Sequence, residues 1–170
     1  MKHLAIGFLF TMLICTVGVR TANAQLTSDD PLVGTWVGWA EPEYRFQAPF
    51  NQVRIQVTFF SDGTGYWNDG HEVIFGHRTG HGKWTKPTSN TFRSTFVLMG
   101  MDTTSVSGAG DHLKIRFSGT IDPSKPDDLT GDVNLTIFPP GTDPLDAADT
   151  GGNLAFGTFK IKSMRRVKLD

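Results

Sequence analysis

Carboxylate, imidazole, phenol and guanidinium side chains gather in two short segments of this sequence. Those that could take part in chemistry are Glu41, Glu43, Tyr44, Arg45, His77, Arg78 and His81. Desolvation over an apolar cavity raises the pKa of a carboxylate and lowers that of an imidazole, so that either group can exchange a proton near neutral pH. If the protein is an enzyme, we predict a cofactor-independent lyase, isomerase or cyclase. Its acid–base residues would be Glu41, Glu43, Tyr44, His77 and Arg78.

His71, His77 and His81 lie close together in the sequence and raise the question of metal binding. In an extended strand, His71 and His77 would lie about 20 Å apart, which is too far for one ion. Only a turn at Thr79-Gly80 brings His77 and His81 together, and this gives two ligands where zinc takes three or four. We therefore expect no metal ion and no other cofactor, and we interpret these histidines as exposed or hydrogen-bonded.

Motifs for nucleophilic catalysis, phosphate binding and calcium binding are not evident in the sequence. It has no Gly-x-Ser-x-Gly nucleophile elbow and no phosphate-binding glycine loop. Asp143, Asp146 and Asp149 recur at every third position, but without the spacing of a calcium loop. We interpret this stretch as a solvated acidic loop.

Aromatic side chains are frequent enough to line a ligand pocket, since the chain has 13 Phe and 4 Trp. Small-molecule pockets are mostly apolar, with a few placed polar groups. The candidates for contact with a ligand are Trp39, Phe46, Phe59, Trp67, Phe75 and Phe96. Aromatic rings dominate cores as well as pockets, so the core alternative stays open for each of them.

Short strands must position these side chains. Val53, Ile55, Val57 and Phe59 alternate with polar residues, which is the pattern of a half-buried strand. Similar patterns recur at 33–40, 91–99, 112–120, 131–138 and 153–164, with Gly-, Asp- and Pro-rich turns between them. No segment shows sustained helical periodicity. We predict an all-β fold, a single antiparallel up-and-down barrel of about eight to ten strands.

The segment 33–39 opens this predicted barrel and contains two of the tryptophans. Glycines inside a strand leave room where a large ring or another backbone comes close, and Trp36 stands between Gly34 and Gly38. This arrangement predicts an indole that plugs one end of the barrel.

The stretch Gly34-Thr35-Trp36, at the start of an all-β chain, resembles the Gly-x-Trp signature of the lipocalin-like (calycin) barrels. The resemblance implies that Trp36 closes the barrel floor, and that an arginine from the last strand packs across it. Arg165 and Arg166 stand in the matching place. We expect Arg165 to be that residue, because it continues the face of Phe159 and Ile161 in an unbroken strand.

Residues 1–24 have the pattern of a secretory signal. Lys2 precedes an apolar run, and Ala22-Asn23-Ala24 supplies a cleavage site. We expect residues 25–170 to form one domain in the periplasm or outside the cell. The apolar run is too short for a membrane span, and we expect none elsewhere. The only cysteine, Cys15, lies in this leader.

The whole chain has a formal net charge of −1, and it lacks the basic stripe of nucleic-acid-binding proteins. The leading interpretation is an exported barrel that takes a small apolar molecule into its cavity. The alternative is the acid–base enzyme described above, and a third is a protein-binding module that acts through its loops. The sequence does not indicate an oligomeric state.

Overall fold

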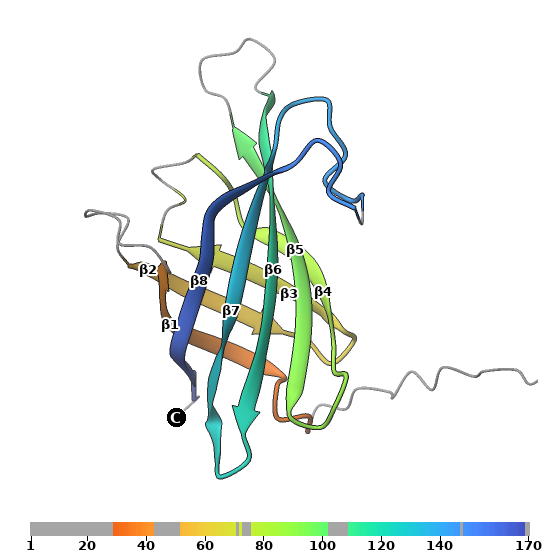
Figure 1. Cartoon of the computed structure of the whole chain (residues 1–170). Helices are drawn as coiled ribbons and strands as arrows, with labels where there is room; N and C mark the ends of the chain where they lie inside the picture. Colours follow the sequence, from red (N-terminus) through yellow and green to blue (C-terminus); the bar gives the residue numbers. More distant parts are fainter. Residues whose placement is uncertain are drawn as a thin grey trace, which may run out of the picture.

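In the computed structural model, residues 29–42, 52–70, 72, 76–101, 109–146 and 148–168 are described, with the backbone alone at Met101, Ala109 and 153–157. Within these ranges, eight antiparallel strands form a closed barrel in which each strand pairs with the next and the last with the first (Figure 1). The predicted all-β up-and-down barrel is confirmed. The strands are β1 (Gly34–Pro42), β2 (Val53–Phe59), β3 (Thr64–Asp69), β4 (Gly80–Thr85), β5 (Thr91–Met101), β6 (Ala109–Asp122), β7 (Lys125–Phe138) and β8 (Asn153–Arg166).

The barrel has two unlike ends. We call the end where β1 starts and β8 finishes the floor, and the opposite end the open end. The short strands β2–β4 have six or seven residues, whereas β5–β8 have 11 to 14. Figure 1 shows the long strands running steeply down one side, with β1–β3 crossing behind them. Among the described residues, no helix is long and apolar enough to cross a membrane.

Alternation along the strands fills the barrel with side chains. In β2, the predicted alternation is confirmed, and the structure decides its direction: Val53, Ile55, Val57 and Phe59 are buried and Arg54 is exposed. The largest fully buried side chains in the shared core include Trp36, Phe59, Trp67, Phe92, Phe96 and Phe117. Their rings meet edge-on or stacked, with centroids from 4.8 to 6.5 Å apart among Phe59, Phe92 and Phe117. Each such burial contributes about 2–3 kcal/mol, so the apolar interior supplies the main stabilisation.

Trp36 lies at the floor, fully buried, and its indole nitrogen donates a hydrogen bond of 2.9 Å to the carbonyl of Leu32. The guanidinium of Arg166, not that of Arg165, lies over the indole, 4.7 Å from the ring centroid. Arg166 also donates to the carbonyls of Val33, at 2.8 Å, and Pro31. The expectation for Arg165 was therefore wrong.

The reason is a bulge in β8. Gly38 pairs with Met164 and Ala40 with Ile161, so Lys162 and Ser163 together face Trp39. An extra residue in one strand moves every later side chain to the other face. Arg165 consequently points outward, with 83% of its side chain exposed, and its nearest carboxylate oxygen on Asp128 is 3.8 Å away.

The loop between β7 and β8, residues 139–146 and 148–152, lies against the outer face of β6 and β7, and we call it the strap. Lys114 Nζ donates to the Asp146 carbonyl at 2.7 Å and to the Asp149 carboxylate at 2.8 Å. Arg116 also donates to Asp149, at 2.7 Å. The strap buries Phe138, and the acidic loop is thus a packed element rather than a solvated one.

Candidate functional site

A buried polar pair, Asp69 and His77, occupies the wall of the barrel toward the open end. In β3, Trp67 and Asp69 share the inward face, because they pair with Val57 and Ile55 of β2. The chain then turns at Gly70 and returns along β5, where His77 forms an isolated antiparallel bridge with Gly100. Arg78 N donates to the Met99 carbonyl at 3.0 Å and holds this segment in place. The turn and the bridge bring the two side chains together.

The two carboxylate oxygens of Asp69 face two different ring nitrogens, one from His77 and one from Trp67. His77 Nε2 lies 3.3 Å from Asp69 Oδ1, and the indole nitrogen of Trp67 donates to Oδ2 at 3.0 Å. Only 4% of His77 is exposed, and the side chain of Asp69 is 9% exposed. A buried carboxylate is tolerated where several donors satisfy its oxygens, which is the arrangement here.

Burial and the neighbouring negative charges act in opposite directions on the pKa of His77. Burial lowers the pKa of His77, but the hydrogen bond to Asp69 and the negative charges of Asp69 and Glu72 outweigh it, so the pKa is raised above 6.5. The pair can therefore hold a proton near neutral pH, which is the requirement for acid–base work and for charge-assisted ligand binding.

One nitrogen of this imidazole is unused. Among the residues that the structure describes, nothing forms a hydrogen bond with the buried Nδ1 of His77. A buried polar atom without a partner costs about 1–3 kcal/mol. With Nε2 donating to Asp69, the neutral ring presents Nδ1 as an acceptor. A hydroxyl or N–H group inside the barrel would satisfy it.

Apolar side chains form the wall around the pair. Ile55 lies opposite Asp69 across β2 and β3, and Leu98 precedes Gly100, the bridge partner of His77. Leu98 in turn pairs with Leu113 of β6, and all three apolar residues are buried. A single polar pair in an apolar wall matches the usual composition of small-molecule sites.

Of the predicted acid–base residues that the structure describes, only His77 belongs to this pair. Glu41 lies on the outer face of β1, where its carboxylate pairs with Lys162 at 2.5 Å. Arg78 is exposed beside His77. Glu43 and Tyr44 lie outside the described residues. Asp69 was not among the predicted residues, because Asn68-Asp69-Gly70 has the composition of a turn, whereas Asp69 also continues the alternation of Trp67.

The predicted ligand-contact residues divide in the same way. Phe59, Trp67 and Phe96 belong to the packed core and have at most 1% exposure. Trp39 lies on the outer face, half exposed, with the Arg54 guanidinium 5.7 Å from its ring centroid. Phe46 and Phe75 lie outside the described residues. Of the described aromatic candidates, Trp67 reaches the polar pair directly, through its bond to Asp69.

No model of a known protein family matches the chain, and no curated protein or solved structure is significantly similar to it. The geometry of the barrel and of the Asp69–His77 pair is therefore the basis for the function proposed below.

Proposed function

We propose that the protein binds a small, largely apolar molecule toward the open end of the barrel and that His77 accepts a hydrogen bond from that molecule. The observation that carries this proposal is the buried His77 imidazole, whose Nδ1 lacks a partner within the described part of the chain. A ligand hydroxyl or N–H group is the partner that fits this atom. The ligand class is thus an apolar body with one donor group.

The packing of the rings supports this placement along the barrel axis. Trp36, Phe59, Phe92 and Phe117 fill the interior toward the floor, where Arg166 closes it. An eight-stranded barrel has room for side chains alone or for one small ligand. The ligand would therefore lie above this aromatic layer, near Asp69 and His77.

The lipocalin-like signature at Gly34-Thr35-Trp36 and the arginine over Trp36 support a carrier of that general kind. The leader pattern in residues 1–24 supports export, and we place the binding in the periplasm or outside the cell. The ligand would then be a molecule met outside the cytoplasm.

A fluorescence titration with 1-naphthol and 1-methylnaphthalene tests the proposal, because the two probes differ mainly in the hydroxyl donor. At a pH above the raised pKa of His77, where the ring is neutral and Nδ1 can accept, we expect the protein to prefer 1-naphthol by about tenfold. His77→Phe should abolish this preference, and His81→Phe, on the outer face of β4, should keep it. Equal binding of the two probes by the unchanged protein, or loss of the preference in His81→Phe, would contradict it.

The same pair supports a second candidate function, acid–base catalysis without a cofactor. An imidazole that is hydrogen-bonded to a buried carboxylate and has a free second nitrogen can take a proton from a substrate. Small molecules recovered from the purified protein and incubated with fresh protein distinguish the two functions. Compounds returned unchanged indicate a carrier, and compounds returned chemically altered indicate an enzyme, with His77 and Asp69 as the first residues to replace.

A further inference from the structure

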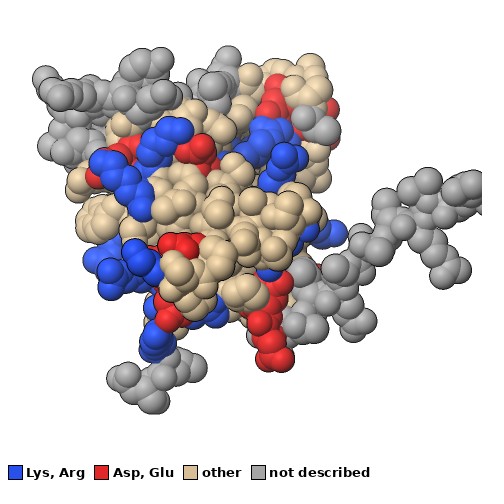
Figure 2. All heavy atoms as spheres, turned by 60° about the horizontal axis from the view of Figure 1, so that its bottom comes forward, with Lys and Arg blue, Asp and Glu red and all other residues tan. Residues whose placement is uncertain are grey.

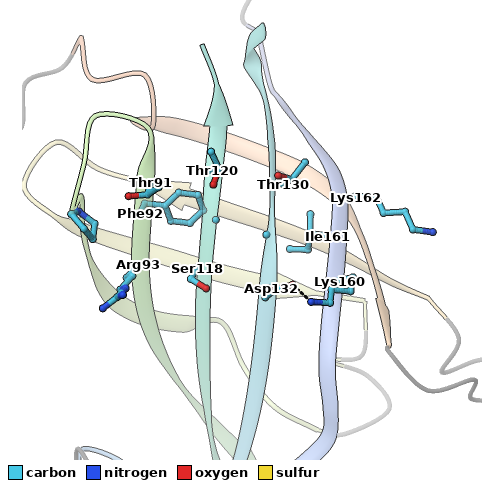
Figure 3. A pocket seen from close by; sticks show the side chains of 13 residues that line it. Thr91, Phe92, Arg93, Ser118, Thr120, Thr130, Asp132, Lys160, Ile161 and Lys162 are labelled. Atoms are coloured by element: carbon cyan, nitrogen blue, oxygen red, sulfur yellow. Dashed lines mark ion pairs between the residues drawn. The ribbon is translucent and has the colours of Figure 1, made fainter. Parts of the chain in front are cut away.

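A separate hollow of about 710 Å³ lies on the outer face of β5–β8 (Figure 3). Two rows of outward side chains cross it. In the first row, Arg93 pairs with Ser118, Ser118 with Asp132, and Asp132 with Lys160. The close-up shows the hydroxyl side chains toward the middle and the basic side chains at the two edges.

The second row is made of hydroxyl groups. Thr91 pairs with Thr120, and Thr120 with Thr130. At the end of this row the β8 bulge turns Lys162 outward, between the positions paired with Leu129 and Gly131. The row therefore presents three hydroxyls and then an ammonium group, and none of its outward side chains is a large apolar one.

The backbone of β6 and β7 forms the centre of the hollow, at two glycines whose Cβ positions face the barrel interior. Gly119 and Gly131 face each other across β6 and β7. A Cβ atom at either position would lie 2.8 Å from the ring of Phe92 or Phe117, so both positions exclude a side chain. The backbone itself, flanked by short hydroxyl side chains, forms the base of the hollow.

Positive charge is in excess along this hollow. Three basic side chains and one carboxylate line it: Arg93, Lys160, Lys162 and Asp132. The Lys160–Asp132 pair, at 2.8 Å, is about half exposed, and Lys162 is 75% exposed while it pairs with Glu41. Exposed pairs of this kind contribute about 0–1 kcal/mol, so their lysines are available to a ligand anion.

This excess is local, because the whole chain has a formal net charge of −1. In the space-filling view, acidic and basic side chains are interspersed around an uncharged central area (Figure 2). Arg93 has no ion-pair partner within the described part of the chain. The hollow thus has basic edges although the chain as a whole is close to neutral.

We propose that this hollow binds an elongated, hydroxyl-rich anion of the acidic oligosaccharide class. From β5 to β8 the sheet spans three strand spacings, about 14 Å, which sets the length of the ligand segment. Acidic groups would meet Arg93 at one edge and Lys162 at the other, and ligand hydroxyls would exchange hydrogen bonds with Thr120 and Thr130. An acidic peptide fits less well, because its carboxylates could meet the basic edges but it would offer no hydroxyl groups to the threonine row. The site is independent of the interior pair Asp69–His77.

Calorimetric titration of the purified protein with a short oligogalacturonate tests this site. We expect binding that weakens as salt is added, because exposed charges are screened. Arg93→Gln and Lys162→Gln should each weaken it about tenfold. The double variant Thr120→Val with Thr130→Val should also weaken it, with all charges kept. Lys83→Gln, an exposed lysine on β4 outside the hollow, is the matched control and should bind as the unchanged protein does.

Three results would overturn the proposal. They are absence of binding by the unchanged protein, an equal loss in Lys83→Gln, and binding of a short oligoglutamate as tight as that of the oligogalacturonate. The last result would assign the surface to acidic peptides instead. Melting temperatures of all variants show whether they remain folded, and the surface positions of all five substituted residues make this the expected outcome.

Discussion

The guanidinium of Arg166 lies 4.7 Å from the centre of the Trp36 indole and joins the last strand to the first at the barrel floor. The same guanidinium donates to the carbonyls of Val33 and Pro31, both of which precede β1. Because one side chain both stacks on the ring and satisfies the lead-in backbone, the floor is closed by a cation and an indole acting together.

The two neighbouring arginines provide a direct test of this closure. Arg166→Ala removes the stacked cation and leaves two carbonyls without their donor, so we expect the free energy of unfolding to fall by about 1–3 kcal/mol. Arg165→Ala removes an exposed side chain and should change it by less than about 0.5 kcal/mol. Urea unfolding followed by tryptophan fluorescence measures both. Equal effects of the two substitutions would contradict the closure of the floor by Arg166.

The two tryptophans of β1 give a second matched pair. Trp36 is fully buried, and its replacement by alanine should lower the free energy of unfolding by about 3–5 kcal/mol. Trp39 is half exposed on the outer face, and Trp39→Ala should cost less than about 1 kcal/mol. Thermal or urea unfolding distinguishes them. An unchanged melting temperature for Trp36→Ala would contradict the plugged floor.

The strap predicts an acid-sensitive contribution to stability. The hydrogen bond from Arg116, helped by Lys114, lowers the pKa of Asp149 from 3.8 to about 2. A lowered pKa stabilises the folded state above the unfolded value, and this contribution is lost as the pH falls from about 4 toward 2. Asp149→Asn should destabilise the protein at pH 7 by about 1–3 kcal/mol, because it leaves the buried Lys114 ammonium without its carboxylate.

The control for the strap is Asp143→Asn, which changes an exposed carboxylate of the same loop. It should leave the stability at pH 7 within about 0.5 kcal/mol of the unchanged protein. Unfolding curves at pH 7 and near pH 2 complete the test. If the gap between Asp149→Asn and the unchanged protein does not narrow at the lower pH, Asp149 is not the group responsible.

The Asp69–His77 pair predicts a pH dependence of stability opposite in direction to that of Asp149. The raised pKa of His77 favours its protonated form in the folded state, so the stabilisation is present below pH 6.5 and is lost as the pH rises through the folded value. Asp69→Asn removes the negative charge, while burial remains, and should lower the pKa of His77. NMR titration of the histidine ring measures this midpoint. Asp111→Asn, an exposed change, should not move it.

The fold was accessible from the sequence because alternation in segments such as 53–59 identifies strands with one apolar face, although it did not decide which face points inward. The β8 bulge could not be predicted from the sequence, since nothing in Lys162-Ser163 differs from ordinary strand residues. One extra residue was enough to place Arg166 over Trp36 instead of Arg165. Bulges are set by pairing with both neighbouring strands, and that information lies in β1 and β7 rather than in β8.

The candidate site could be predicted only in part from the sequence, because it also depends on contacts between distant parts of the chain. His77 was singled out by its type, but its partner Asp69 is reached through the bridge between His77 and Gly100, a contact between distant parts of the chain. The strap shows the same limit, because the acidic loop becomes a packed element only through Lys114 and Arg116 of β6.

The most direct test of ligand binding in the barrel is an NMR titration of ¹⁵N-histidine-labelled protein with 1-naphthol. If His77 accepts a hydrogen bond from the ligand, the Nδ1 resonance of His77 moves saturably, while both ring nitrogens of the exposed His81 stay unchanged. A titration in which His77 Nδ1 does not move, or in which His77 and His81 drift together without saturation, contradicts the account.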